Sequence, residues 1–319
     1  MPNAASSGLP NAASYTDLGN GAVLDNITCL VWQKAESPSD ASSSGCSSAS
    51  DAGAADDAGA PCGITEDIAY CDSLSASNAA GYSDWRVPTR VEIASIVDPT
   101  RTSSALNPIF TKEASGYDRT FSLWYETIAG IKNSTFGWVY NMGSGLTSNA
   151  YGQTSPAMVR CVRGNGTGET LMEQAVEPPN HYTIGSDGEV TDNYTGLIWQ
   201  QAYSTTSMDW SAAAGYCSSL GLNGNTWRVP SLNELSTLVN EAVVSPAVNR
   251  TAFPNVVSCG TTTWFWAAEA YAGNSTYAWG INFCDGYTGY NVGQAHATDA
   301  GTTTYDWDYF QTGYARCVR

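Results

Sequence analysis

The stretch Asn274-Ser275-Thr276-Tyr277-Ala278-Trp279-Gly280-Ile281-Asn282 has a second version nearer the N-terminus, Asn133-Ser134-Thr135-Phe136-Gly137-Trp138-Val139-Tyr140-Asn141. Both versions contain Asn-Ser-Thr, an aromatic residue, a Trp and a final Asn, in the same order and at the same spacing. The aromatic residue, the Trp and the residue two places beyond it alternate along the chain, which predicts a strand with one buried face. The chain therefore contains an internal duplication, and its other segments can be assigned to one repeat or the other.

Each repeat opens with a segment that predicts a β-hairpin. Residues 23–33 and 190–200 both run from a strand-like start, through an Asp-Asn turn, to an apolar run that ends in Trp-Gln. Asp25 and Asp192 carry a side chain that can bind metal ions. The favoured interpretation is instead that each carboxylate closes its own turn.

Two short helices are predicted in each repeat, and the second is the better marked. Directly after Trp-Arg-Val-Pro, the pairs Thr89-x-x-Glu92 and Ser231-x-x-Glu234 have the pattern of a capping box. Apolar residues then recur at helical spacing. The two glutamates are interpreted as parts of helix caps rather than as general acids, because neither has a partner carboxylate at an interpretable spacing.

These repeats divide the 319 residues into two domains with a linker between them. The first repeat occupies residues 1–163 and carries a Ser/Ala/Asp-rich insertion at 35–62, which is expected to form a surface loop. Residues 164–180 are the linker, and residues 181–319 are the second repeat. Each repeat ends in Arg-Cys-Val-Arg.

The charge and composition of the chain exclude several classes of partner. The net charge is −17, and no lysine follows Lys132, which argues against nucleic acids and anionic membrane surfaces as partners. Charged residues make up only 13% of the chain and aromatic residues 11%, which suits an exported protein. No apolar stretch is long enough to predict a membrane span, and no secretory leader is recognised at Met1.

The cysteine pattern favours disulfide bonds over metal sites. The nine cysteines include no Cys-x-x-Cys, and only two histidines are present, His181 and His296. Zinc ribbons, zinc fingers and c-type haem attachment therefore have no support. Cysteines at equivalent positions of the two repeats are typical of an oxidising compartment. Cys46 and Cys62 bracket the insertion, so either they pair with each other or one of them pairs with Cys29.

The motifs described above carry a resemblance to a known family. They are the Val-x-Asp-x-x-Thr start, the Trp-Arg-Val-Pro before a capped helix, the Trp-rich strands and the terminal Arg-Cys-Val-Arg, and together they cover nearly all of both repeats. On these motifs the chain resembles the bacterial Lcl C-terminal domain family, also called DUF1566. Cys29 departs from the pattern, since the family has Gly at that position.

The resemblance implies a fold and a general role. The expected fold is α+β, in two tandem C-type-lectin-like domains, each with short helices packed on small antiparallel sheets. The family is associated with extracellular adhesion. Some members are variable proteins of diversity-generating retroelements, which present hypervariable residues to ligands.

The resemblance also implies a set of disulfide bonds. It suggests that Cys71 pairs with Cys161 and that Cys217 pairs with Cys317, each tying the first helix of a repeat to its terminal strand. Cys259 and Cys284 occur only in the second repeat and are then left to pair with each other. This assignment leaves one odd thiol among the remaining three cysteines of the first repeat.

The segment before the last cysteine differs most between the repeats. It runs from 286 to 316 in the second repeat and only from 145 to 160 in the first, and the longer version is filled with Tyr, Trp, Asp and Asn. This composition is typical of adaptable binding loops. The alternative is that the rings pack on their own core or against the first repeat. The candidate ligand-binding residues are Trp264, Trp266, Tyr277, Trp279, Asn282, Asp285, Tyr287, Tyr290, Asn291, Tyr305, Asp306, Trp307, Asp308 and Tyr309.

A cofactor is not predicted, although calcium is considered. Asp285, Asp306 and Asp308 are oxygen ligands of the kind that Ca²⁺ prefers, but the sequence spells no complete calcium loop. A nucleophile elbow, a phosphate-binding loop and a dinucleotide fingerprint are all missing from the sequence. His181 and His296 are expected to be surface residues, so the chain is not expected to be an enzyme.

The sequence therefore predicts an extracellular or cell-surface protein that binds a ligand or promotes adhesion. The second repeat would display an aromatic-rich, hypervariable site to a protein or glycan on a cell surface. The alternative function is a structural subunit that associates with itself into a surface layer or fibre.

Overall fold

The computed structural model describes most of both repeats. The described residues are 1–37, 64–101, 104–111, 124–130, 136–152, 158–164, 177, 179–240, 243, 246–255, 259, 264–290 and 312–319, with backbone alone at 64–66, 124–130, 136–137 and 148–152.

The first repeat is built from short strands and two short α-helices. A 3-10 turn, η1, lies between the helices. The elements are β1 (Tyr15–Asp17), β2 (Ala22–Asp25), β3 (Val31–Gln33), α1 (Ile64–Ala76), η1 (Ala79–Gly81), α2 (Arg90–Ser95), β4 (Trp124–Gly130), β5 (Phe136–Asn141), β6 (Thr147–Gly152) and β7 (Val162–Arg163).

The second repeat contains the same kinds of element in the same order. Its elements are β8 (Tyr182–Ile184), β9 (Glu189–Asp192), β10 (Ile198–Gln200), α3 (Trp210–Ser219), η2 (Leu222–Gly224), α4 (Leu232–Ser236), β11 (Trp264–Ala270), β12 (Ala278–Asn282) and β13 (Tyr287–Tyr290).

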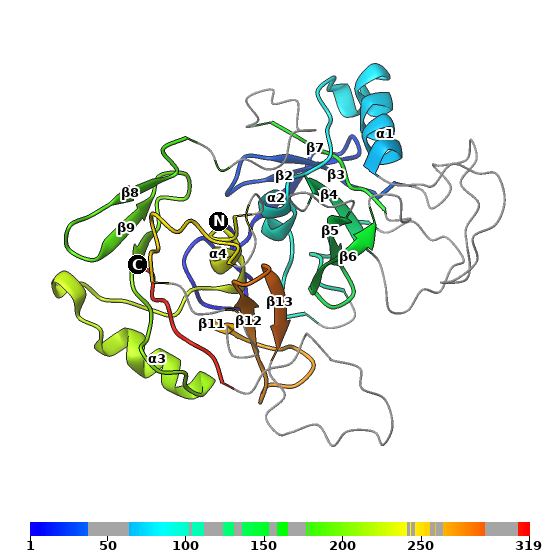
Figure 1. Ribbon diagram of the computed structural model, residues 1–319. Helices are drawn as coiled ribbons and strands as arrows, with labels where there is room; N and C mark the ends of the chain where they lie inside the picture. The colour runs from blue at the N-terminus through cyan, green and yellow to red at the C-terminus, as the bar shows by residue number, and fades with distance from the viewer. Residues whose placement is uncertain are drawn as a thin grey trace, which may run out of the picture.

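Each repeat contains two small antiparallel sheets, which confirms the α+β prediction. The first repeat has the order β1-β2-β3-β7 in one sheet and β4-β5-β6 in the other. The second repeat has β10-β9-β8 and β11-β12-β13, and a bridge from Trp199 to Val318 takes the place of β7. In Figure 1 the sheets β4-β5-β6 and β11-β12-β13 both lie near the centre, and the helices α2 and α4 lie close to them.

The duplicated stretch forms the central strand of the second sheet in each repeat. Trp124 lies opposite Asn141 in the first repeat, and Trp264 lies opposite Asn282 in the second. The Asn-Ser-Thr of the second repeat belongs to a turn, and β12 begins only at Ala278. The turn forms because the side chain of Asn274 accepts hydrogen bonds from Thr276, at 3.0 Å from its N–H and 2.8 Å from its hydroxyl.

The Asp-Asn turns have the structural role expected of them. The Asp25 carboxylate accepts from the N–H of Ile27 at 2.9 Å, and Asp192 accepts from the N–H of Tyr194 at the same distance. Cys29 stands in a left-handed backbone conformation with φ 61°, as Gly196 does with φ 73°. The departure from Gly at this position therefore leaves the turn unchanged, because Cys29 adopts the same conformation.

Both predicted capping boxes are present. Thr89 accepts from the N–H of Glu92 at the start of α2, and Ser231 accepts from the N–H of Glu234 at the start of α4. Each glutamate also receives two hydrogen bonds from an arginine of the Trp-Arg-Val-Pro motif, at 2.6–2.7 Å from Arg86 and at 2.7 Å from Arg228. The motif therefore closes the helix start with a bidentate ion pair.

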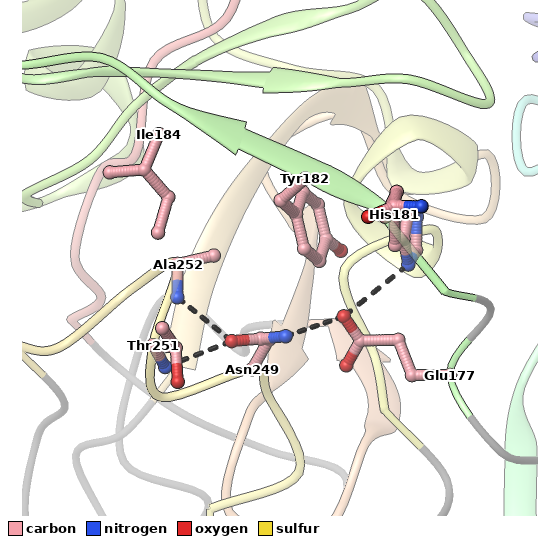
Figure 2. Close-up of a pocket in the computed structure, with 8 residues that line it drawn as sticks. Glu177, His181, Tyr182, Ile184, Asn249, Thr251 and Ala252 are labelled. Atoms are coloured by element: carbon pink, nitrogen blue, oxygen red, sulfur yellow. Dashed lines mark hydrogen bonds and ion pairs between the residues drawn. The ribbon is translucent and has the colours of Figure 1, made fainter.

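A pocket of about 350 Å³ opens beside β8. His181, Tyr182 and Ile184 line it together with Glu177 and the loop at 249–252, as Figure 2 shows. The side chain of His181 is 14% exposed and lines the open pocket, so the expectation that it is a surface residue holds only in part. Its ring stacks on Tyr182 with a centroid distance of 4.0 Å, which draws it out of the solvent.

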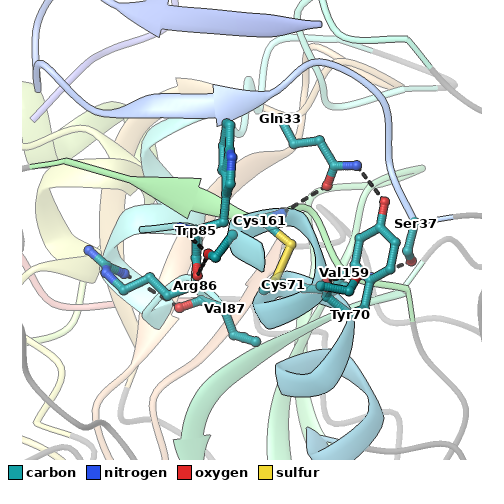
Figure 3. Close-up of a disulfide and its surroundings, with 11 residues drawn as sticks. Gln33, Ser37, Tyr70, Cys71, Trp85, Arg86, Val87, Val159 and Cys161 are labelled. Atoms are coloured by element: carbon teal, nitrogen blue, oxygen red, sulfur yellow. Dashed lines mark hydrogen bonds between the residues drawn. A yellow bond between two sulfur atoms is a disulfide. The ribbon is translucent and has the colours of Figure 1, made fainter. Parts of the chain in front are cut away.

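The disulfide pairing implied by the resemblance is confirmed. Cys71 pairs with Cys161 and Cys217 with Cys317, with Cα atoms 5.7 Å and 5.5 Å apart. Around the first of these bonds, shown in Figure 3, the Gln33 side chain donates to the Tyr70 hydroxyl at 2.6 Å and accepts from the N–H of Cys161 at 3.3 Å. The second repeat has the same arrangement, with Gln200, Tyr216 and Cys317 in these places.

The pairing of the other five cysteines is described in part. Cys259 pairs with Cys284, as expected. Cys29 is a free, exposed thiol, so the alternative in which it pairs with Cys46 or Cys62 is wrong; those two cysteines lie outside the described residues. The three disulfides among the described residues indicate an oxidising environment. Among the described helices, none is long and apolar enough to cross a membrane.

The two repeats meet in an approximately symmetric interface. The N–H of Thr147 donates to the Thr288 hydroxyl at 2.9 Å, and the N–H of Thr288 donates to the Thr147 hydroxyl at 2.9 Å. This reciprocal pair places β6 beside β13. The fully buried Arg90 of α2 donates to the carbonyl oxygens of Ser236 and Gly286 in the second repeat, at 3.2 Å and 2.8 Å.

The first residues of the chain pack on the second repeat. The Asn233 side chain of α4 donates to the carbonyl oxygen of Pro2 at 3.0 Å, and the buried Asn3 donates to the Glu234 carboxylate at 3.2 Å. Figure 1 accordingly shows the N-terminus next to α4. The first residues of the chain therefore tie the two repeats together.

Candidate functional site

Three tyrosine rings stack at one end of the sheet β11-β12-β13. Tyr271 follows β11 directly, Tyr277 precedes β12 directly and Tyr290 ends β13. The rings of Tyr271 and Tyr290 are nearly parallel, 3.9 Å apart with an interplanar angle of 8°, and Tyr277 stacks over Tyr290 at 6.4 Å and 12°. All three side chains are partly exposed. These three residues are named the tyrosine stack.

The tyrosine stack rests on a buried tryptophan. Trp279 of β12 is fully buried, and its ring meets Tyr271 and Tyr290 edge to face, at centroid distances of 5.5 Å and 5.6 Å. Edge-to-face contacts of this kind add to the energy of burial and fix the angle between rings. The stack is therefore held in a defined orientation by the core beneath it.

The segment that carries Tyr271 and Tyr277 is polar but uncharged. No Asp, Glu, Lys or Arg occurs at any position from 270 to 284, and the exposed turn between β11 and β12 offers Asn274, Ser275 and Thr276. Ring faces beside small hydrogen-bonding groups suit ligands that are themselves neutral and partly apolar.

The sequence of the first repeat does not contain the three tyrosines of the stack. By strand register, Asn149 takes the place of Tyr290, and Phe136 takes the place of Tyr277. The residue after β4 is Ile131, where the second repeat has Tyr271 after β11. The feature therefore belongs to the second repeat alone, although both repeats share the scaffold under it.

Three of the candidate ligand-binding residues are core residues, so their assignment to a binding site is wrong. Trp264, Trp266 and Trp279 are between 0% and 2% exposed. Trp266 also uses its indole N–H inside the protein, donating to the carbonyl oxygen of Met208 at 2.8 Å. Alternation along a strand predicts two faces, and in this small sheet both faces are covered by protein.

Three further candidates lie at the opposite end of the sheet, where they serve the turn and the interface. The side chain of Asn282 accepts from the N–H of Cys284 at 2.9 Å. Tyr287 packs edge to face on Trp138 of the first repeat at a centroid distance of 5.8 Å. For this residue the alternative that the rings pack against the first repeat is therefore correct. Burial raises the pKa of the Asp285 carboxyl to about 6.

The remaining candidates divide between the tyrosine stack and the part of the chain that is not described. Tyr277 and Tyr290 belong to the stack. Asn291, Tyr305, Asp306, Trp307, Asp308 and Tyr309 lie outside the described residues. Calcium binding by Asp306 and Asp308 stays a prediction. Within the described residues, no group of three or more His, Cys, Asp or Glu could hold a metal ion.

Tyr271 is a residue of the tyrosine stack that the sequence reasoning missed. It flanks the turn at 272–276, with Tyr277 at the other end, and its N–H donates to the Tyr277 carbonyl oxygen at 2.8 Å. Two tyrosines placed on either side of a short turn between strands indicate a cross-strand aromatic pair. That signal was available in the sequence.

A buried carboxyl group on β11 ties this sheet to α4. Glu269 is 5% exposed and accepts from the N–H of Leu232, the first residue of α4, at 2.9 Å. Burial raises the pKa of Glu269 to about 7, and the nearby carboxylates of Glu234 and Asp98 act in the same direction. The first repeat also has a glutamate on the matching strand, Glu126 of β4. Glu126 is not the counterpart of Glu269, because the strand register places Glu126 where the second repeat has Trp266.

We expect Glu269→Gln to stabilise the protein above neutral pH. The pKa in the folded state lies above its ordinary value, so the unfolded state loses its proton first as pH rises from about 4.5 to 7, and stability falls over that window. The native carboxyl therefore costs on the order of 3 kcal/mol at pH 8. Glutamine keeps the acceptor for Leu232 without the charge. Urea unfolding at pH 4.5 and pH 8 measures the difference.

The matched control is Asp187→Asn, which removes an exposed carboxylate from the same repeat. It should leave the free energy of unfolding unchanged at both pH values. Equal stabilities of Glu269→Gln and the native protein at pH 8 would show that the buried carboxyl carries no penalty.

The comparisons with known proteins place the repeats in one family. The model of the Lcl C-terminal domain matches residues 21–163 and 188–319. Both matches begin at a glycine with positive φ in the first hairpin, Gly21 and Gly188. No curated protein and no solved structure matches the chain. Because the two matches cover most of both repeats, the chain belongs to the Lcl C-terminal domain family and carries two copies of that domain in tandem.

Proposed function

We propose that this protein is an extracellular ligand-binding or adhesion protein, and that the tyrosine stack is part of its binding site. The observation that carries the proposal is the stack itself: three partly exposed, nearly parallel tyrosine rings in the second repeat, where the first repeat has Ile131, Phe136 and Asn149 at the matching positions. Rigid amphipathic rings give a large contact area at little cost in conformational entropy. Two copies of one scaffold, of which only the second carries the tyrosine stack, are suited to the binding of a ligand by that second copy.

The scaffold beneath the stack supports a binding role. Trp279 orients the rings from below, and the bond between Cys217 and Cys317 ties the first helix of the repeat to its last residues. Binding is stronger when the contact residues are ordered before the ligand arrives. The cell-surface location in this proposal extends the oxidising environment that the disulfides indicate.

The chemistry of the stack favours a protein or a glycan as ligand. Ring faces pack against the apolar faces of sugar rings or against side chains, and the neighbouring Asn, Ser and Thr supply hydrogen bonds. The lectin-like form and the hypervariable display that the family resemblance implies fit the same role. If the second repeat does display such a hypervariable site, we expect Tyr305, Trp307 and Tyr309 to belong to it.

We expect Tyr277→Ala and Tyr290→Ala each to weaken ligand binding about tenfold or more, because truncating an aromatic anchor typically costs at least about 1–2 kcal/mol. The measurement is binding of the full chain to a glycan array and to intact cells, followed by titration of the strongest ligand. The proposal fails if both variants bind that ligand as the native protein does.

The control variant is Tyr194→Ala. Tyr194 is 62% exposed and lies in the turn after β9, outside the stack. Its removal should leave binding unchanged. Sedimentation of the pure native protein tests the alternative function: discrete small species favour a binding protein, and large ordered polymers favour a subunit of a surface layer or fibre.

A further inference from the structure

The pocket beside β8 contains a partly buried carboxylate. The side chain of Glu177 is 18% exposed and points between His181 and Asn249, as Figure 2 shows. Its two oxygens accept from the side-chain amides of Asn249 and Asn240, each at 2.5 Å. Amides satisfy hydrogen-bonding capacity but carry no charge, so these two contacts do not neutralise the negative charge of Glu177.

His181 is shared between two carboxylates. Its Nδ1 lies 3.6 Å from Glu177 Oε1, and its Nε2 lies 3.3 Å from Oδ1 of the fully buried Asp192. One imidazole carries at most one positive charge, so the three groups together are net negative. Among the described residues, no lysine or arginine lies within ion-pair distance of Glu177, and none lines the pocket.

The rest of the pocket is lined partly by apolar surface, which suits the apolar part of a ligand. Tyr182, Ile184 and Ala252 contribute ring and aliphatic surface, and the cavity of about 350 Å³ is open to solvent. A bare metal ion would need several ligands, and the described residues offer no such cluster. His181 is shared with Asp192, so a cation that enters this open pocket would supply the positive charge that Glu177 lacks.

The first repeat carries an ammonium group of its own at the corresponding end of its hairpin, where it pairs with a different carboxylate. Lys34 Nζ lies 2.5 Å from Asp17 Oδ2. By the register of the hairpins, Asp17 and Lys34 correspond to Ile184 and Gln201 in the second repeat. The second repeat contains no lysine at all. An ammonium group is therefore present at this place in one repeat and missing from the other.

We propose that the pocket binds a primary ammonium group on a short apolar stem. The ammonium pairs with Glu177 and its stem lies along Tyr182 and Ile184. Both a free small amine and the side chain of a lysine on a protein partner have this chemistry. The site is separate from the tyrosine stack and does not depend on it.

Isothermal titration of the full chain at low salt tests the proposal with three probes. They are n-butylammonium, which represents a free amine; Nα-acetyl-lysine methylamide, which represents a lysine side chain; and n-butanol, the neutral control. We expect binding of at least one ammonium probe and none of n-butanol. Preference for one ammonium probe identifies the source of the ligand. Failure of both to bind the native protein overturns the proposal.

Two substitutions locate the site. Glu177→Gln should weaken ammonium binding at least tenfold, and Asp187→Asn, which removes an exposed carboxylate outside the pocket, should not change it. Ile184→Lys should also abolish binding, because the new ammonium occupies the pocket from within. Ile184 is 43% exposed, so this variant keeps the fold even if Glu177→Gln does not. Native-like binding by Ile184→Lys would overturn the proposal.

Discussion

Replacement of both Cys217 and Cys317 by alanine should lower the free energy of unfolding by about 4–5 kcal/mol. The bond closes a loop with a sequence separation of 100, and in the loop-entropy model a loop of that length stabilises the folded state by about 4.7 kcal/mol. Both cysteines are fully buried in the core of the second repeat. Urea unfolding followed by tryptophan fluorescence measures the change.

The other disulfides provide a graded comparison. Loss of the Cys71–Cys161 bond, with a separation of 90, should cost nearly as much, whereas loss of Cys259–Cys284, with a separation of 25, should cost about 3.5 kcal/mol. An equal loss in all three double variants would argue against the loop-entropy account. A loss below about 1 kcal/mol for the Cys217–Cys317 pair would show that packing alone holds the terminal strand.

The features that the sequence predicted well are those with a local or a duplicated cause. A capping box needs only residues three apart, so Thr89 with Glu92 and Ser231 with Glu234 could be read directly. The turns closed by Asp25 and Asp192 are local in the same way. Disulfide pairing is not local, and it became predictable only because the same two cysteines recur in both repeats of a recognised family.

The features that the sequence did not predict depend on contacts between distant segments. Alternation showed that Trp279 faces one side of a strand, but not that the first repeat covers that side. In the same way, the sequence does not show that His181 is partly covered, which follows from the stacking of Tyr182 and the position of Asp192. Partners of this kind lie far apart in the chain or depend on the geometry of a hairpin, so composition and spacing do not reveal them.

The tyrosine stack shows where the boundary between the two cases lies. Tyr277 and Tyr290 were candidates because of residue type, and Tyr271 could have been added from the pattern of the turn. The separation of these rings from the buried tryptophans needed the structure, since all of them share the same aromatic-rich segment. A binding site rich in aromatic residues and a core rich in aromatic residues have the same composition.

Trp279→Ala should be the most damaging single substitution in the core, lowering the free energy of unfolding by about 3–5 kcal/mol. The ring is fully buried, supports the tyrosine stack and reaches into the first repeat, where its Nε1 donates to the carbonyl oxygen of Pro99 at 3.0 Å. It also lies against Gly145: a Cβ at that position would stand 3.7 Å from its Cη2. Urea unfolding of the full chain measures the loss.

A second substitution separates the two roles of this tryptophan. Trp279→Phe keeps a ring beneath the tyrosine stack but removes the hydrogen bond to Pro99, so it should cost about 1–2 kcal/mol and leave ligand binding largely intact. Trp279→Ala should weaken binding as well, because Tyr271 and Tyr290 lose the surface that orients them. If the alanine variant binds ligand normally while its stability falls, the stack does not need this support, and the rings are ordered by their contacts with one another.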